Sequence, residues 1–150
     1  MKWSLTSFDQ IDLRTTHSFR ARSRARRQNR DADTLPRMTS KQFRAHALSL
    51  PEASEAPHFD RASFRVGKKI FATLTADGAE AMVRVSPRQR LYALLKEQPE
   101  VFFSYGGWTE RNGSLGVRLG KADVRLLCEL VTDSWRLIAP KRAIALVARH

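Results

Sequence analysis

Residues 57–74 read PHFDRASFRVGKKIFATL, and this stretch decides the fold. Apolar and polar residues alternate on both sides of a Gly-Lys-Lys turn at residues 67–69. Such alternation is typical of strands with one buried face, and glycine lets the chain turn sharply because it tolerates positive φ angles. The pattern therefore predicts a β-hairpin with strands over about residues 63–66 and 69–75 and a positively charged tip.

A third strand extends this hairpin into a meander. The turn signal Ala-Asp-Gly at residues 76–78 separates the second strand from an alternating segment at residues 81–85. We expect three antiparallel strands with one buried face and one partly basic face. The predicted faces are Ile70, Ala72 and Leu74 against Lys69, Phe71 and Thr73 in the second strand, and Val83 and Val85 against Met82 and Arg84 in the third.

Helix signals flank the meander. Thr39 and Gln42 stand at capping-box spacing and open a first helix that Pro51 ends, so residues 51–57 are expected to form a loop. A second helix should start with Ser86 as cap and Pro87 at its first position, and Gln89 would complete a second capping box. The last long helix is predicted over about residues 122–137 and carries an apolar face, before a short helical end that follows Pro140. That face consists of Val124, Leu127, Cys128, Val131 and Trp135.

A second hairpin is expected between the last two long helices. An apolar run at residues 101–105 is followed by a Gly-Gly-Trp break, a polar turn at residues 110–113 and a strand in which Leu115, Val117 and Leu119 alternate with smaller or charged residues. The order of elements is helix, three strands, helix, two strands, helix. This order is typical of an α+β protein, and we predict an antiparallel sheet of about five strands packed by helices on one face.

Charge is the unusual feature of the composition. The 150 residues include 27 Lys and Arg against 15 Asp and Glu, a formal net charge of +12. A surface this basic attracts polyanions such as nucleic acid. The apolar runs are far shorter than the roughly 20 residues that span a bilayer, no secretory leader opens the chain, and Cys128 is the single cysteine. We therefore expect a cytoplasmic protein without a membrane partner.

Residues 1–37 differ from the rest and are predicted to form a basic, disordered arm before a domain at residues 38–150. The arm holds nine basic and four acidic residues and little apolar periodicity, so it cannot bury enough surface to offset its chain entropy. It either adds phosphate contacts or is an extension before a natural start at Met38. We favour the extension, because a helix start follows Met38 at once. The domain alone keeps a charge of +7.

Several segments of the domain resemble landmarks of the MmcQ/YjbR-like family, in the same order along the chain. They are residues 38–44, 48–53, 57–59, 64–74 and 135–142. The resemblance implies an α+β fold related to the double-wing type, with hairpins as wings, and a DNA-binding role. Two positions depart from the family pattern: Lys68 stands where a second glycine is frequent and adds charge to the turn, and Ser114 stands where a tryptophan is common.

The residue chemistry suggests where DNA would bind. Arg65, Lys68 and Lys69 at the first hairpin tip can reach phosphates, or they are a solvated turn. Arg111 offers a second basic tip with Trp108 nearby for stacking, unless Trp108 fills the core. Lys141 and Arg142 either contact the backbone of DNA or belong to a helix terminus. No recognition helix presents paired Arg or Asn side chains, so we expect double-stranded DNA to be held mainly through phosphates with weak sequence preference.

Catalytic patterns are absent from the sequence. His58 and Asp60 resemble a base with its orienting carboxylate, but we favour a loop histidine, and Cys128 lies on an apolar helix face. The histidines have no metal-ligand spacing, and the glycines at residues 106–107 and 113–116 are too sparse for a phosphate-binding loop. We predict no enzymatic activity, cofactor or metal. The alternative function is a domain that binds a small ligand or a protein in a cleft bordered by Phe71, Tyr105 and Trp108.

Overall fold

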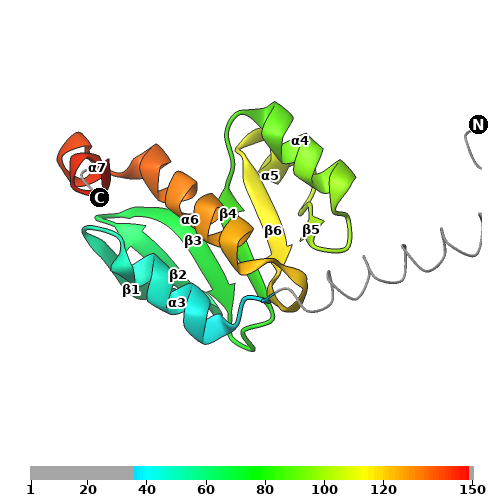
Figure 1. The fold of residues 1–150 in the computed structure, drawn as a ribbon, viewed down its shortest axis with the longest axis horizontal. Coiled ribbons are helices and arrows are strands. Elements are labelled where there is room, and N and C mark those ends of the chain that lie inside the picture. Colours follow the sequence, from blue (N-terminus) through cyan, green and yellow to red (C-terminus); the bar gives the residue numbers. More distant parts are fainter. Residues whose placement is uncertain (1–35, 149–150) are drawn as a thin grey trace, which may run out of the picture. The chain divides into compact units, whose positions relative to one another are not determined.

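A six-stranded antiparallel sheet forms the centre of the computed structural model, which describes residues 36–148 (Figure 1). Its strands lie in the order β1-β2-β3-β4-β6-β5. They span Ala53–His58 (β1), Arg61–Val66 (β2), Lys69–Thr75 (β3), Glu80–Arg84 (β4), Phe102–Phe103 (β5) and Ser114–Arg118 (β6). The predicted α+β class and antiparallel sheet are confirmed, with one strand more than expected.

Within residues 36–148, five α-helices and one short 3-10 helix accompany the sheet. The α-helices are α3 (Ser40–Ser49), α4 (Arg88–Glu97), α5 (Gly107–Arg111), α6 (Val124–Ile138) and α7 (Lys141–Ala148), and the 3-10 helix is Leu119–Lys121. Helix α6 packs against β3 and β4, and α3 packs against α6 and β1, so both lie on one face of the sheet (Figure 1). The core between these layers includes Phe43, Phe64, Phe71, Phe102 and Trp135, all with at most 2% of their surface exposed.

Most of the predicted arm lies outside the described residues. Its last two residues are described and contact the start of α6 and the 3-10 helix that precedes it. The carbonyl of Pro36 accepts a hydrogen bond from the backbone N–H of Val124, and Nη1 of Arg37 donates to the carbonyl of Lys121. The part of the chain that the structure describes therefore begins with backbone tied to the domain.

The predicted start of the first helix is confirmed at atomic detail. The hydroxyl of Thr39 accepts from the backbone N–H of Gln42, and the Gln42 side chain accepts from the backbone N–H of Thr39. The prediction of a second capping box, in contrast, is wrong. Helix α4 begins one residue later than expected, so Pro87 is its N-cap and no side chain caps it. Ser86 then lies outside the helix, where its hydroxyl cannot reach the first turn.

Strand β1 corrects the prediction of a loop at residues 51–57. Its sequence ASEAPH contains residues with low strand propensity, and it is an edge strand that pairs with β2 alone. An edge position tolerates Pro57, because a proline lacks the N–H that an interior strand needs on both sides. Tertiary pairing with β2, not local preference, makes this segment a strand.

A β-bulge corrects the predicted faces of β3. The register with β2 shifts between Phe64 and Arg65, whose partners are Ala72 and Ile70, so Phe71 has no partner of its own. Phe71 therefore joins the core beside Ala72, and Ile70 faces the same side as Thr73. The hydroxyl of Ser134 on α6 satisfies the local backbone by donating to the carbonyl of Phe71 and accepting from the N–H of Arg84.

The second predicted hairpin is only partly correct. Strand β5 does pair with β6, but it has two residues, and helix α5 replaces the expected polar turn. Gly113 follows this helix with φ of 83°, and its N–H donates to the carbonyl of Glu110. The glycine that suggested a hairpin turn therefore ends a helix, a role that also needs positive φ.

Candidate nucleic-acid interface

One end of the sheet gathers basic side chains from segments far apart in the sequence. Lys68 and Lys69 are exposed at the turn between β2 and β3, where Gly67 has φ of 63°. The neighbouring strand β4 runs antiparallel to β3 and ends at this same end with Arg84, whose Nε donates to the carbonyl of Ile70 at 3.3 Å. The hairpin predicted from residues 57–74 thus places its tip beside the end of β4.

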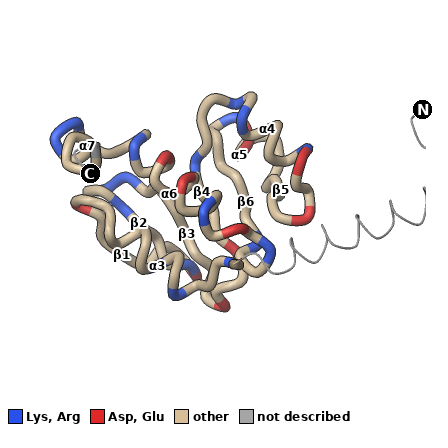
Figure 2. The backbone as a smooth tube through the Cα atoms, in the orientation of Figure 1, with Lys and Arg blue, Asp and Glu red and all other residues tan. Residues whose placement is uncertain are grey.

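Two further arginines extend this cluster. Arg88 and Arg111 line a depression of about 570 Å³ together with Arg84, and Nη2 of Arg88 donates to the carbonyl of Arg111 at 3.0 Å. We call the side chains of Lys68, Lys69, Arg84, Arg88 and Arg111 the basic end. In residues 36–148 the ion pairs join other residues, so carboxylates do not neutralise the basic end. Figure 2 shows Lys and Arg segments along this margin of the sheet.

Arg65 was expected at the hairpin tip, but it lies along the sheet. Its Nε donates to the hydroxyl of Ser63 at 2.8 Å and its Nη2 donates to the carbonyl of Pro57 at 3.3 Å. The side chain is half-buried and bridges β2 to β1. Arg65 therefore differs from Lys68 and Lys69, which extend into solvent.

The two basic residues at the start of α7 are also unlike each other. Lys141 is exposed, whereas Arg142 forms a bidentate ion pair with Glu52 at distances of 2.9 and 3.0 Å. The hydrogen bond from Arg142 to the Glu52 carboxylate raises the pKa of the guanidinium. A nearby carboxylate offsets the charge that Arg142 could offer to a phosphate, so Lys141 is the better donor of the two.

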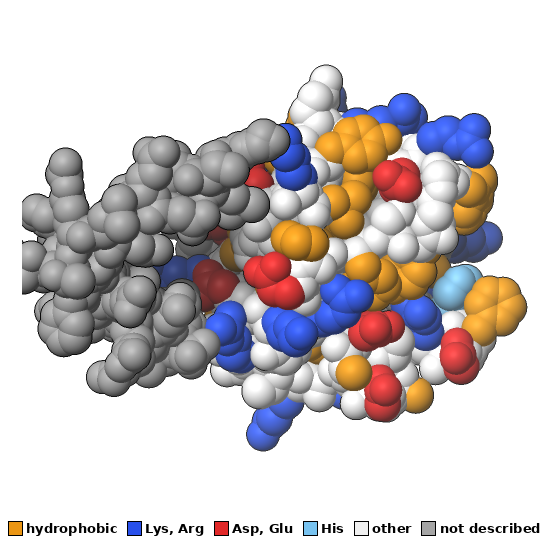
Figure 3. Space-filling view, turned by 90° about the vertical axis from the view of Figure 1, so that its right-hand side faces the viewer, with side chains coloured by type: hydrophobic (Ala, Val, Ile, Leu, Met, Phe, Trp, Pro, Cys, Tyr) orange, Lys and Arg blue, Asp and Glu red, His pale blue; other side chains and the backbone are white. Residues whose placement is uncertain are grey.

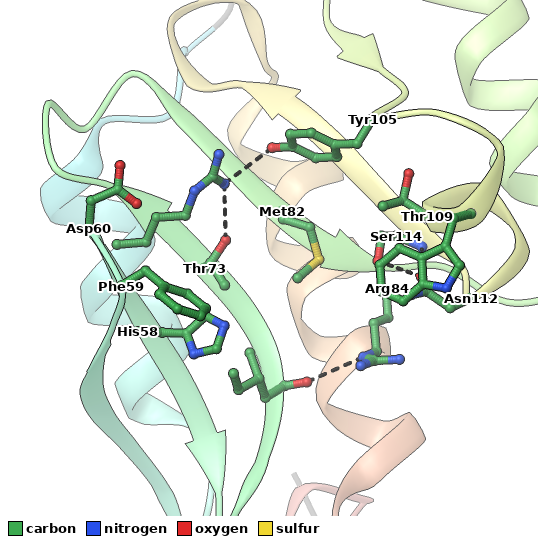
Figure 4. A pocket seen from close by; sticks show the side chains of 13 residues that line it. His58, Phe59, Asp60, Thr73, Met82, Arg84, Tyr105, Thr109, Asn112 and Ser114 are labelled. Carbon is green, nitrogen blue, oxygen red and sulfur yellow. Dashed lines mark hydrogen bonds between the residues drawn. The ribbon is translucent and has the colours of Figure 1, made fainter.

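A cleft of about 420 Å³ lies next to the basic end, on the sheet face opposite α6. Its floor is formed by Ile70, Thr73 and Met82, and its walls carry Tyr105 and Trp108 on one side and the turn between β1 and β2 on the other. Figure 4 shows Phe59 on one side of Met82 and Thr109 and Asn112 on the other. The bulge in β3 contributes directly, because it turns Ile70 to this face.

Aromatic side chains on the rim of the cleft are unusually exposed. Phe59 has 94% and Trp108 has 71% of its surface exposed, which excludes the interpretation that Trp108 fills the core. Figure 3 shows hydrophobic side chains reaching the surface among Lys and Arg side chains on this part of the molecule. Phe71, which was expected to border the cleft, is fully buried on the other face of the sheet.

Two arginines, Arg61 and Arg84, and one carboxylate, Asp60, are the charged side chains that line the cleft. Nη1 of Arg61 donates to the hydroxyl of Tyr105 at 3.3 Å and to that of Thr73 at 3.4 Å, and the guanidinium carbon lies 5.5 Å from the centre of the Tyr105 ring. The hydrogen bond with Tyr105 is the main cause that raises the pKa of Arg61. The cleft therefore combines two guanidinium groups and one carboxylate with exposed aromatic surface.

The polar end of the cleft leaves hydrogen-bond donors available. Oδ1 of Asn112 accepts from both the backbone N–H and the hydroxyl of Ser114, at 3.2 and 2.7 Å. Because a backbone N–H can only donate, this contact fixes which side-chain atom of Asn112 is oxygen. Its amide nitrogen has no partner in the described part of the chain. Ser114, one of the two departures from the family pattern, thus holds Asn112 in place.

Sequence reasoning missed Phe59, Arg61, Arg84 and Asn112 as candidate site residues. One local signal was present: Phe59 occupies a tight turn, where glycine and polar residues are typical. The other three line one cleft only in the folded chain, where β2 and β4 flank β3 and Asn112 follows α5.

The residues considered for catalysis do not form a reactive group. The His58 ring packs edge-on against Phe59 with centroids 4.7 Å apart, and burial raises the pKa of the Cys128 thiol. Burial also lowers the pKa of His46, whose Nε2 lies 3.1 Å from the carbonyl oxygen of Cys128. Within residues 36–148 there is no cluster of three or more His, Cys, Asp or Glu side chains able to hold a metal ion. His17 and His150 lie outside the described residues.

The sequence of residues 48–137 matches the model of the family described as YjbR. The chain belongs to the YjbR family. This confirms the resemblance found in the sequence. The fold agrees as well: a crystal structure of a Deinococcus radiodurans protein with a DUF419 domain superposes with a TM-score of 0.60 at 21% identity, covering 75% of this chain and 90% of that one.

Curated relatives of this YjbR chain carry no assigned activity. Proteins of Mycobacterium tuberculosis and Mycobacterium bovis, both named as uncharacterized, are 33% identical over 109 residues, which covers 61% of this chain and 81% of each relative. The helices at residues 36–148 are all too short or too polar to cross a bilayer.

Proposed function

We propose that this YjbR-family chain binds DNA through its basic end. The observation that carries the proposal is the convergence of five basic side chains at one end of the sheet, where none of them joins an ion pair with another residue of the described chain. They are Lys68, Lys69, Arg84, Arg88 and Arg111. Phosphate contacts dominate the affinity of most nucleic-acid-binding proteins. They require positive side chains that can extend from the protein surface toward a phosphate.

The difference between the two ends of the domain supports this proposal. At the opposite end Asp77 belongs to the turn between β3 and β4, Glu80 is the first residue of β4, and Arg118 stacks on the Phe103 ring at 4.7 Å. If positive charge served only solubility, basic side chains should be spread evenly over the surface. One end of the domain would then not collect basic side chains while the other end holds acidic and basic side chains together. An uneven field of this kind orients a polyanion as it approaches.

The test is a charge reversal at the hairpin tip. We expect the wild-type chain to bind a labelled 20-base-pair duplex in a salt-dependent manner, and Lys68→Glu with Lys69→Glu to lower both affinity and salt dependence. Loss of two phosphate contacts should lower the slope of log affinity against log salt by about 2. Fluorescence anisotropy at a series of salt concentrations measures both quantities.

The matched control reverses two lysines at the other end. Lys41 follows Ser40, which lies against Gly78 in the turn between β3 and β4, and Lys96 belongs to the last turn of α4. Both are exposed, so Lys41→Glu with Lys96→Glu changes net charge equally. Equal losses of duplex affinity in the two double variants would mean that DNA is attracted diffusely and not at one interface. Unchanged affinity in Lys68→Glu with Lys69→Glu would mean that the hairpin tip is not part of the interface.

A site for a small ligand is the second candidate, because the cleft exposes Phe59 and Trp108 where no folding advantage requires it. Absence of duplex binding at low salt, together with saturable binding of a small molecule in the cleft, would favour that function over DNA binding.

A further inference from the structure

Phe59 is both strained and exposed. It occupies the first position of the two-residue turn between β1 and β2, where His58 pairs with Arg61, and its φ is 58°. This conformation suits glycine, whereas a side chain there crowds the backbone. Solvent surrounds 94% of the residue, so the ring gains no burial that could offset the strain. Strain at an exposed aromatic residue indicates a role in binding.

A second exposed aromatic residue lies across the cleft. Trp108 belongs to α5, and it lines the same cleft as Phe59, Arg61, Tyr105 and Arg84. These side chains come from separate segments of the chain: Phe59 from the turn between β1 and β2, Arg61 from β2, Arg84 from β4 and Trp108 from α5. Successive bases of a single strand stack on exposed rings while arginine and lysine side chains bind the phosphates between them.

We infer that the cleft binds unpaired bases of single-stranded nucleic acid, with Phe59 and Trp108 as stacking surfaces. The inference rests on the proposed function and specifies it. Arg61 and Arg84 outnumber Asp60 among the residues that line the cleft, and Lys68 and Lys69 continue the positive charge toward the basic end, where the strand would leave. In a duplex neighbouring pairs cover the faces of each base, so these rings have access only to an unpaired strand.

The dimensions of the cleft agree with this occupant. Its volume of about 420 Å³ lies within the range of about 300–1,000 Å³ in which proteins bind molecules of nucleotide size. The Asn112 amide nitrogen supplies hydrogen-bond donors at the cleft wall that a base edge or a phosphate can accept. A partner protein would instead need a larger and less charged surface to bind stably.

The experiment compares one labelled 15-nucleotide strand with its own duplex, using the full-length chain. We expect the single strand to bind more tightly than the duplex. Phe59→Gly and Trp108→Ala should each weaken single-strand binding by about tenfold or more, because stacking on one ring contributes this much per base. Duplex affinity should stay within about twofold of the wild type in both variants, because phosphate contacts remain.

Tyr92→Ala is the matched control. Tyr92 is an aromatic residue on α4 with 47% of its surface exposed, and it does not line the cleft. Phe59 and Trp108 contribute little to the core, and urea unfolding of each variant verifies that the domain is intact. Intrinsic fluorescence gives an independent signal. The single strand should quench the fluorescence of the wild-type chain, and Trp108→Phe should lose most of this quenching.

The outcomes separate this inference from the proposed function. If duplex binding depends on Lys68 and Lys69 but Phe59→Gly and Trp108→Ala bind the single strand as Tyr92→Ala does, the stacking inference is wrong and the basic end stands. If neither form of nucleic acid binds, the proposed function fails. If thymidine monophosphate binds in the cleft while the strand does not, the cleft is a site for a free nucleotide and the inference is overturned.

Discussion

At the level of single residues, side chains of the same type have different roles because their neighbours differ. Lys68 is exposed without a carboxylate partner, whereas Arg142 is held by both oxygens of Glu52, and Arg65 bridges two strands. The sequence shows three basic residues near turns or helix ends. Only their partners distinguish the one that is free to bind a phosphate from those that are occupied.

Phe59 provides a test of stability at this scale. We predict that Phe59→Gly is more stable than Phe59→Ala by about 1 kcal/mol, because alanine keeps a Cβ at a positive φ and glycine removes it. Neither change removes buried surface, so the comparison isolates the backbone. Urea denaturation measures the free energy of unfolding of both variants. An alanine variant as stable as the glycine variant would mean that the turn does not hold residue 59 at positive φ.

At the level of helices and strands, single side chains on α6 bind the backbone of the sheet at specific points. Ser134 on α6 is fully buried, and its hydroxyl joins the carbonyl of Phe71 in the bulge of β3 to the N–H of Arg84 at the end of β4. The bulge frees backbone groups that a regular ladder would pair. One serine therefore binds the backbone of the bulge, next to Ile70, and the backbone at the end of β4, at Arg84.

We predict that Ser134→Ala lowers the free energy of unfolding by about 1–3 kcal/mol, because it leaves two buried backbone groups without a partner. Ser54→Ala in β1 is the control, since Ser54 is exposed and an exposed substitution typically changes stability by no more than about 0.5 kcal/mol. Thermal or urea unfolding measures both. Equal effects at the two positions would mean that Ser134 does not support the bulge.

The elements predicted from the sequence are those with strong local signals. Alternation gave β2, β3 and β4 nearly to the residue, and the Thr39–Gln42 capping box gave the start of α3. Strand β1 was missed because its residues favour other conformations, and α5 was taken for a turn because Gly113 serves helix ends and hairpins alike. The bulge could not be predicted from the alternation of residues 69–75, and Ser134, which contacts it, lies far away in the sequence.

Across the whole molecule, His46 links two helices that are far apart in the sequence. It lies on α3, and its Nε2 is 3.1 Å from the carbonyl oxygen of Cys128 and 2.9 Å from the hydroxyl of Thr132 on α6. Glu129, Asp133 and Arg136 line the same depression. Desolvation lowers the pKa of His46 below its usual value of 6.5, so the folded domain favours the neutral ring.

This shift predicts how global stability depends on pH. Below pH 6.5 the unfolded chain takes up the proton before the folded chain does, so the free energy of unfolding should fall as the pH decreases toward the lowered pKa of His46. His46→Gln removes this titration. We expect the wild type to lose more stability than His46→Gln between about pH 7.5 and about pH 5.5, measured by urea unfolding. Parallel curves for the two proteins would contradict the prediction.

Residue patterns were enough to predict the family, the α+β class, a meander over about residues 63–85 and the excess of positive charge, because these depend on periodicity, local turn chemistry and composition. Folding was needed to show which basic residues of the described chain pair with a carboxylate and where Phe59 and Trp108 line one cleft. Pairing partners such as Glu52 and Ser134 act on residues many positions away, and the cleft forms only where residues of β2, β3, β4 and α5 come together. Local patterns carry no information on such contacts, since chain topology alone brings their atoms within bonding distance.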